Sequence, residues 1–186
     1  TDVFMQANRA YFQSKGILSG ETFDHAELNP EKAVYKGTTY DFILFAEGKD
    51  GKSNPLFAYL PLQQTKGEVL TLASETMYAK ESLNRKCFLL PLGEGRFKVG
   101  STYAWDTDNT IPTEAGKQAI TENLKSVTSE VYTITEHKAG VRPTVPDRRP
   151  LVGRHPVFPK MVIANGLGTK GYMIAPLLMY ELVNHL

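Results

Sequence analysis

The sequence has almost no cysteine and no grouping of metal-binding side chains. Cys87 is the single cysteine among 186 residues, which excludes a disulfide framework and argues against a thiolate metal cluster. It lies in the apolar segment KCFLLPL, where we expect a small buried side chain. The four histidines have no spacing typical of metal ligands, and we expect all of them to be non-catalytic: His25, His137, His155 and His185.

Long apolar runs and an excess of one charge are also missing. No stretch reaches the roughly 18 apolar residues of a transmembrane helix, and no charged segment followed by an apolar core resembles a secretory leader. We therefore expect a cytoplasmic protein with no membrane partner. The 21 basic and 20 acidic residues nearly cancel, so the chain lacks the electrostatic footprint of a protein that binds a polyanion. Charge alone thus predicts no nucleic-acid partner.

The apolar residues that are present predict short strands and a few amphipathic helices. Helices are predicted at 2–15, 113–128 (with Thr113 as its N-cap) and 172–186, and strands at 17–28, 32–40, 40–48, 66–75, 86–92, 96–105 and 161–165. The continuous apolar run from Phe42 to Ala46 is typical of a central strand covered on both faces. This order of elements favours an α+β fold with a mixed, mainly antiparallel sheet over a doubly wound one.

Gly166, Gly168 and Gly171 form a G-x-G-x-x-G pattern between a predicted strand and a predicted helix. The pattern is typical of a dinucleotide pyrophosphate site, but that site needs a second strand and an acidic residue about 20 residues further on. Neither follows Gly171. Glu181 is acidic, but it lies within the predicted helix and cannot stand at the end of a second strand. Two interpretations stay open: a connecting turn, or a backbone platform at a helix N-terminus for a ligand that carries or develops negative charge.

Several segments taken in order resemble FAD-dependent oxidoreductases of the D-amino-acid oxidase superfamily. The segments are YDFILFAEG, KGEVL, CFLLPLGEGRFKVGST, AGVRPTVPDRRPLVG and MVIANGLGTKGYMIAP. The glycine oxidase branch and the oxidase domain of the tRNA-modifying MnmC proteins look most similar. In that family the pyrophosphate-binding glycine loop lies near the N-terminus, together with an acidic ribose partner. The resemblance therefore implies that this chain corresponds to the C-terminal half of such an enzyme, without the N-terminal half that would be its partner.

The resemblance also implies a division into domains. Residues 1–48 would be the distal part of an FAD-binding, Rossmann-like domain, and 49–155 would be a substrate-binding domain. Residues 156–186 would return to the FAD-binding domain as its last strand, a flavin-contacting loop and the C-terminal helix. A chain without the N-terminal glycine loop would bind FAD weakly and would be inactive alone.

The same resemblance assigns site residues. Arg142 matches the arginine that binds the substrate carboxylate, with pairing to Asp147 as the alternative. Phe88 stands where related enzymes often have a tyrosine, and Tyr103 would compensate if it faced the same pocket. Flavin contacts are implied for the loop and the start of the helix: Gly166, Leu167, Gly168, Thr169, Lys170, Gly171 and Tyr172. Lys170 could instead point to water, and Tyr172 could simply attach the helix to the sheet.

Arg148 and Arg149 lie in the turn-like segment PDRRP, where we expect structural or solvated side chains.

Three functions are consistent with these observations. The first is an FAD-dependent oxidoreductase that oxidises a small amine or amino acid by hydride transfer to flavin, with no protein nucleophile and no metal. The second is a non-catalytic binding or subunit protein with the same fold, favoured by Phe88 and by the missing nucleotide loop. The third is the oxidase domain of a tRNA-modifying enzyme, against which the near-neutral charge argues.

Overall fold

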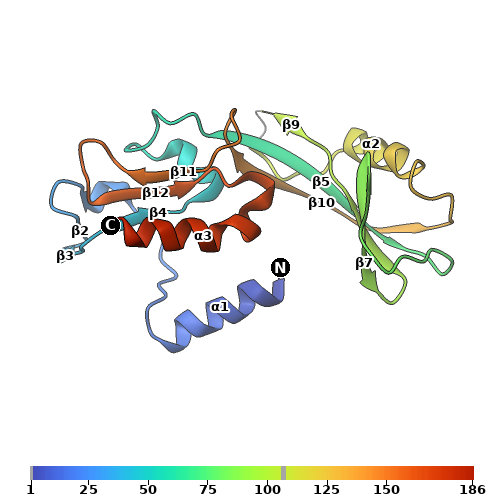
Figure 1. The fold of residues 1–186 in the computed structure, drawn as a ribbon, viewed down its shortest axis with the longest axis horizontal. Coiled ribbons are helices and arrows are strands. Elements are labelled where there is room, and N and C mark those ends of the chain that lie inside the picture. The colour runs from blue at the N-terminus through green and yellow to red at the C-terminus, as the bar shows by residue number, and fades with distance from the viewer. Residues whose placement is uncertain (1, 106–107) are drawn as a thin grey trace.

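The structure, a computed structural model, describes residues 2–105 and 108–186. Its α-helices are α1 (Asp2–Ser14), α2 (Glu114–Leu124) and α3 (Gly171–Asn184), and its 3-10 turns are η1 (His25–Glu27), η2 (Gly48–Ser53) and η3 (Gly168–Lys170). The strands form one six-stranded and two three-stranded sheets. Figure 1 shows an elongated molecule in which two long strands, β5 (Gln63–Ala73) and β10 (Thr133–Thr144), run from one half to the other.

The six-stranded sheet carries the larger core. Its order is β10-β5-β8-β7-β6, with β9 beside β5, and its remaining strands are β6 (Leu83–Arg85), β7 (Cys87–Gly93), β8 (Arg96–Gly100) and β9 (Ala104–Trp105). Helix α2 covers one face (Figure 1), where Leu70, Leu72 and Leu89 pack with Ile120 and Leu124. Because side chains alternate along a strand, Thr65, Gly67 and Val69 point to the opposite face.

A smaller sheet of order β11-β12-β4 carries the second core. Its strands are β4 (Ile43–Phe45), β11 (Leu151–Arg154) and β12 (Met161–Asn165), and β12 pairs parallel with β4 and antiparallel with β11. All five residues of β12 are buried, and α3 runs alongside this sheet (Figure 1). The α+β class with mainly antiparallel pairing is therefore confirmed, with β12/β4 as a parallel pair.

The apolar run at Phe42–Ala46 forms β4, which lies at the end of its sheet among the described residues, with Leu44 45% exposed. Its position as a central strand of the whole protein stays a prediction. The predicted strand at 17–28 is mostly irregular, since the Asp24 carboxylate accepts a hydrogen bond from the Ala26 N–H at 2.9 Å and starts η1 instead.

A small meander follows that turn, with strands β1 (Leu28–Asn29), β2 (Val34–Tyr35) and β3 (Thr38–Thr39). The sequence predicted one strand over 32–40. The reversal occurs at Lys36 and Gly37, both with positive φ (47° and 79°), which is the geometry of a tight hairpin turn.

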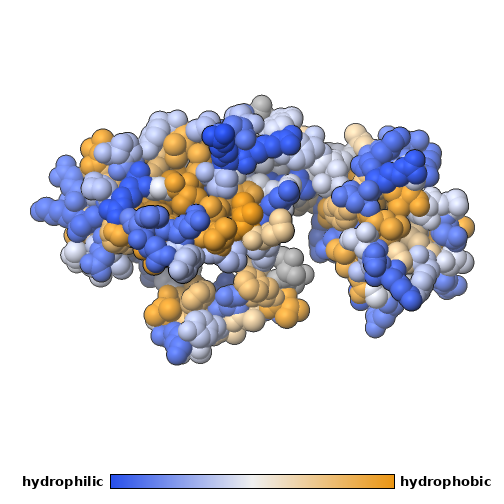
Figure 2. Space-filling view, viewed as in Figure 1, coloured by the Kyte–Doolittle hydropathy of each residue, from blue (hydrophilic) through white to orange (hydrophobic). Residues whose placement is uncertain are grey.

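Helix α1 forms as predicted, and Gly16 follows it with φ of 67°. Its predicted apolar face is not buried, because Phe4 and Tyr11 are 58% and 56% exposed. Phe4 contacts Tyr172 at the start of α3, with ring centroids 5.7 Å apart. Apolar side chains also gather on the exposed surface of α1 and α3 in Figure 2.

Candidate active site

A cavity of about 510 Å³ lies where the loop before α3 meets the end of β10 and the segment after β8. Three parts of the chain that are distant in sequence line it: Tyr103 and Trp105; Thr144, Val145 and Arg148; and Gly166, Leu167, Gly168, Thr169, Lys170 and Ile174. Residues 166–170 of the predicted flavin contacts thus share one cavity with Tyr103, a predicted substrate residue. The fold brings together residues that the sequence assigned to one site.

The glycine loop has the backbone geometry that its composition suggests. Gly166 and Gly168 have φ of 70° and 58°, which only glycine adopts without strain. A Cβ on Gly166 would lie 2.5 Å from Val145 Cγ2, whereas one on Gly168 would meet nothing within 4 Å. Gly166 therefore allows the loop to pass close to β10, and Gly168 leaves backbone open to the cavity.

Helix α3 begins directly after this loop, and its first turn is not closed by a side chain. Lys170 is its N-cap and makes no side-chain cap hydrogen bond. The first N–H groups of a helix have no partner within the helix, and the helix dipole places partial positive charge there. The start of α3 is therefore suited to a group that carries or develops negative charge.

Asn165 holds the loop in place, and sequence reasoning missed it. This residue is 3% exposed; its Nδ2 donates to the Gly48 carbonyl at 2.9 Å, and its Oδ1 accepts from the Gly166 N–H at 2.8 Å. The side chain thus ties the turn after β12 to the turn after β4. A polar residue at the end of the otherwise apolar segment MVIAN was the feature of the sequence that could have identified Asn165.

Arg142 lies beside the cavity with an incomplete set of hydrogen bonds. Its Nη2 donates to Ser101 Oγ at 3.1 Å, and its guanidinium carbon lies 5.9 Å from the centre of the Tyr103 ring. Its Nη1 is buried and has no hydrogen-bond partner among the described residues. A buried donor without a partner costs about 1–3 kcal/mol, and more when charged. Arg142 Nη1 can therefore donate to an acceptor that lies outside the described residues.

The alternative pairing of Arg142 with Asp147 is not found. The Asp147 carboxylate instead accepts a hydrogen bond from the Arg149 N–H at 3.0 Å. A glycine makes room for Arg142, because a Cβ on Gly67 would lie 2.1 Å from Nη1. Gly140 lies opposite Gly67 in the β10/β5 register, but a Cβ there would meet nothing within 4 Å, so the guanidinium lies over Gly67 and not over Gly140.

The other predicted site residues take different positions. Phe88 is half-buried on the same sheet face as Arg142, across Gly100, but it does not line the cavity. Thr169 and Lys170 are exposed and line it, while Gly171 starts α3. Tyr172 does not line the cavity; it is 55% exposed and contacts Phe4. Arg148, predicted to be structural or solvated, is exposed and also lines the cavity.

The opposite face of the same sheet holds a buried charged cluster beneath α2. The Glu68 carboxylate accepts hydrogen bonds from the Thr113 N–H and hydroxyl, both at 2.9 Å, and from His137 Nε2 at 2.8 Å. Lys66 Nζ lies 3.5 Å from it. Burial opposes ionisation of Glu68, but these hydrogen bonds and the Lys66 ammonium together hold the pKa of its carboxyl below the ordinary value.

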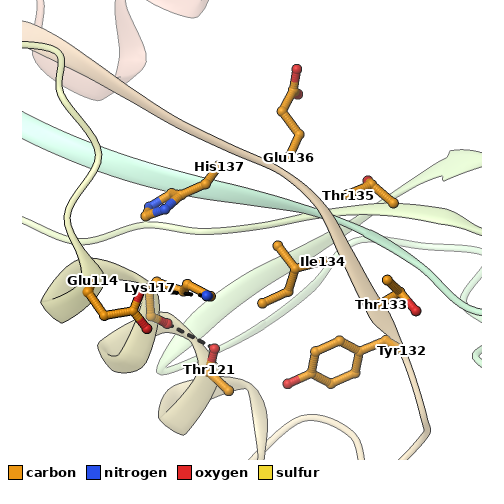
Figure 3. A pocket seen from close by; sticks show the side chains of 9 residues that line it. All are labelled: Glu114, Lys117, Thr121, Tyr132, Thr133, Ile134, Thr135, Glu136 and His137. Carbon is orange, nitrogen blue, oxygen red and sulfur yellow. Dashed lines mark hydrogen bonds and ion pairs between the residues drawn. The ribbon is translucent and has the colours of Figure 1, made fainter.

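An open hollow of about 640 Å³ lies next to this cluster, between α2 and β10. In Figure 3 the Glu114, Lys117 and Thr121 side chains come from α2, and His137 and Ile134 come from the strand opposite. The hollow has no contact with the glycine loop, so it is separate from the cavity at Tyr103. His137 lines the hollow and contacts the Glu68 carboxylate through Nε2; its expected non-catalytic character stays a prediction.

Two negative findings hold for residues 2–105 and 108–186. These residues contain no group of three His, Cys, Asp or Glu side chains that could hold a metal ion. None of their helices has the length and apolar character needed to cross a membrane.

A family model and several known proteins match this chain. The family model described as DAO, FAD dependent oxidoreductase, matches residues 2–183. Glycine oxidase of Bacillus subtilis (strain 168) is 25% identical over 188 residues, covering 90% of this chain and 49% of that protein. The bifunctional MnmC protein of Legionella pneumophila, of tRNA 5-methylaminomethyl-2-thiouridine biosynthesis, is 23% identical over 145 residues, covering 75% of this chain and 22% of that protein.

The fold is shared with a solved structure. Glycine oxidase from Geobacillus kaustophilus has a TM-score of 0.72 at 20% identity, covering 89% of this chain and 48% of that one. The chain thus spans about half the length of the glycine oxidases that it matches. On the match over residues 2–183, the chain belongs to the DAO family of FAD-dependent oxidoreductases.

Proposed function

We propose that the protein oxidises a small amine or amino acid that carries a carboxylate, by hydride transfer to FAD. The proposal draws on membership of an FAD-dependent family and on the glycine oxidases among the relatives. The observation that carries it is the Arg142 guanidinium, whose Nη1 is buried and without a partner next to the cavity.

Arg142 would bind the substrate carboxylate. A guanidinium is planar, always charged and able to donate two parallel hydrogen bonds to a carboxylate. Ser101 already holds Nη2, so the group is oriented before the substrate arrives and loses little freedom on binding. Fixing the carboxylate in this way fixes the α C–H bond of the substrate relative to the loop at 166–170.

The residues around the cavity fit a flavin ring. FAD, when bound, supplies the acceptor for the hydride that leaves the α carbon. Gly166, Leu167, Gly168 and Thr169 would offer backbone to the ring, and the uncapped start of α3 at Gly171 would stabilise negative charge there. Lys170 adds a positive charge at the same place, and Tyr172 would contribute by holding α3 against Phe4.

Tyr103 and Phe88 would complete the substrate side. The Tyr103 ring faces the Arg142 guanidinium, a contact that restrains the arginine and closes one wall of the cavity. Phe88 would give an apolar boundary further along the same sheet face, without the hydroxyl that a tyrosine would offer. The division into domains at 1–48, 49–155 and 156–186 belongs to the same proposal, as does a cytoplasmic location.

Replacement of Arg142 tests the proposal. In the flavin-loaded full-length protein, Arg142→Ala should lower kcat/KM for a carboxylate-bearing amine by about a hundredfold or more, because a charge-assisted bidentate contact is lost. Arg142→Lys should retain part of the activity. Flavin content, measured from the visible absorbance, should be nearly unchanged.

Two controls accompany this measurement. Arg149→Ala removes a neighbouring exposed arginine outside the cavity lining and should leave kcat/KM unaltered. An amine without a carboxylate should be oxidised equally poorly by the protein and by its Arg142→Ala variant. Unchanged turnover of the carboxylate-bearing amine in Arg142→Ala would remove Arg142 from the site.

A second candidate is the oxidase domain of a tRNA-modifying enzyme, favoured by the similarity to MnmC. The 21 basic and 20 acidic residues argue against a tRNA-binding surface on this part of the protein. The two candidates differ in their substrate: oxidation of free small amines supports the first, whereas oxidation that requires tRNA supports the second. Failure to retain FAD in either assay would support a non-catalytic subunit.

A further inference from the structure

More positively charged side chains lie around the cavity than the binding of one substrate carboxylate requires. Arg148 and Lys170 line it, Arg142 lies next to it, and its lining contains no acidic side chain among the described residues. Lys170 stands at the start of α3, where the proposed function uses positive charge for the flavin. Arg142 is assigned to the first carboxylate of the substrate. Arg148 is then the positively charged residue of the cavity lining to which the proposed function assigns no role.

A tight turn holds Arg148 at this position. The Arg148 N–H donates to the Val145 carbonyl at 2.9 Å, and the Arg149 N–H donates to the Asp147 carboxylate at 3.0 Å. Arg148 adopts φ of 61°, a left-handed conformation that costs energy for a residue with a side chain. The turn directs Arg148 into the lining of the cavity, whereas Arg149 is not part of that lining.

Among residues 2–105 and 108–186, no acidic side chain forms an ion pair with the Arg148 guanidinium. The neighbouring Asp147 carboxylate accepts a hydrogen bond from the Arg149 N–H instead. Arg148 is exposed while it lines the cavity, which places it at the opening. Tyr103 lines the cavity together with Arg148, and its ring contacts the Arg142 guanidinium.

We propose that the substrate carries a second anionic group, which Arg148 binds at the mouth of the cavity while Arg142 binds the first carboxylate. The class is a dicarboxylic amine, such as an amino acid with an acidic side chain or an amine with two carboxyalkyl arms. This assignment rests on the proposed function and narrows it. Both anionic groups are recognised by guanidinium groups, which donate paired hydrogen bonds to carboxylates.

Equilibrium binding of unreactive carboxylates tests this assignment without turnover. The probes are malonate, succinate and glutarate, each compared with the monocarboxylate of equal chain length: propionate, butyrate and valerate. Dissociation constants are measured for the flavin-loaded full-length protein by calorimetry and by the perturbation of flavin absorbance, at constant ionic strength to keep screening equal. At least one dicarboxylate should bind about tenfold more tightly than its matched monocarboxylate.

Three variants test whether Arg148 causes the preference for a dicarboxylate. Arg148→Gln should abolish the preference for the dicarboxylate and leave the monocarboxylate constants unchanged. Arg148→Gly should also abolish the preference. Because glycine adopts the left-handed conformation without strain, this result would show that backbone strain does not cause the preference. Arg149→Gln is the matched control and should keep the preference in full.

The outcomes separate this assignment from the proposed function. If monocarboxylates bind through Arg142 but no dicarboxylate binds more tightly, Arg148 has no such role and the proposed function stands. If the preference survives Arg148→Gln, the assignment to Arg148 is wrong. If no carboxylate binds at all, or if Arg142→Gln leaves every constant unchanged, the proposed function itself fails.

Discussion

Gly67 is the residue that makes room for Arg142, so its substitution tests the geometry of the site without touching the arginine. A methyl group at Gly67 would lie 2.1 Å from Nη1 and 2.4 Å from the guanidinium carbon. The flexible end of Arg142 would have to move aside, which costs little stability but misplaces the carboxylate-binding group.

We expect Gly67→Ala to raise KM for a carboxylate-bearing amine by about tenfold, with a change in the free energy of unfolding below about 1 kcal/mol. The control is Gly140→Ala, at the register partner of Gly67, where an added Cβ meets nothing within 4 Å. Steady-state kinetics and urea unfolding give both quantities. Equal kinetics for the two variants would contradict the position of Arg142.

Glu68 links stability to pH. Its carboxyl is buried and receives hydrogen bonds from Thr113 and His137, which hold its pKa below the ordinary value of 4.5. Because the folded state prefers the ionised form, the stabilisation is fully present above the unfolded pKa. It is lost as pH falls through the lower folded value.

We expect Glu68→Gln to lower the free energy of unfolding by about 2 kcal/mol at neutral pH, and this difference should shrink on acidification below about pH 4. Urea unfolding at a series of pH values measures it. Glu94→Gln serves as control, because the Glu94 side chain is 86% exposed and its partner Arg96 lies 3.5 Å away. A difference that grows towards acid would contradict the ionised state of Glu68.

At the scale of elements, helix α2 depends on the same cluster. Thr113 is its N-cap: Oγ1 accepts from the Gly116 N–H at 3.0 Å and donates to Glu68 Oε1 at 2.9 Å. Gly116 allows this approach, since a Cβ there would lie 2.3 Å from Glu68 Oε2. One hydroxyl therefore caps the helix and attaches it to β5.

Thr113→Ala should destabilise the protein by about 1–2 kcal/mol, because a helix cap and a partner of a buried carboxylate are lost together. Thr113→Ser keeps the hydroxyl and should recover most of that free energy. Combined with Glu68→Gln in a double-mutant cycle, the losses should be clearly less than additive. Strict additivity in urea unfolding would show that the two side chains act independently.

At the scale of the whole molecule, the described residues contain one strand–glycine-loop–helix unit, at 161–184, and no second one that could hold an adenosine diphosphate. The chain spans about half the length of the glycine oxidases that it matches. We therefore propose that these 186 residues alone are inactive and bind FAD weakly through the ring.

Titration of the isolated chain should give a dissociation constant for FAD of about 1 µM or weaker. FMN, which has the same ring but lacks the adenylate, should bind with nearly equal affinity, because the contacts proposed here reach only the ring end. Fluorescence quenching of the flavin measures both constants. Stoichiometric binding of FAD, or a large preference for FAD over FMN, would overturn this prediction.

Local pattern was sufficient for much of the fold. The pattern of apolar residues predicted β5, β7 and β8, and the N-cap at Thr113 was also predicted. The glycine spacing indicated the loop between the last strand and the last helix at 161–186. The exposure of α1 was not predictable, because it depends on which segments lie alongside the helix. The turn at Asp24 depends on a local hydrogen bond to the Ala26 N–H, which the pattern of apolar residues did not indicate.

The sequence by itself determined the fold class, the family and the residue types of the site, because periodicity, glycine spacing and the order of the segments are properties of the chain. The tertiary structure decided how those residues meet. Register sets Gly67 under Arg142 and leaves Nη1 without a partner. A turn with positive φ brings Arg148 into the cavity. Such contacts join positions far apart in sequence, and only packing in three dimensions fixes them.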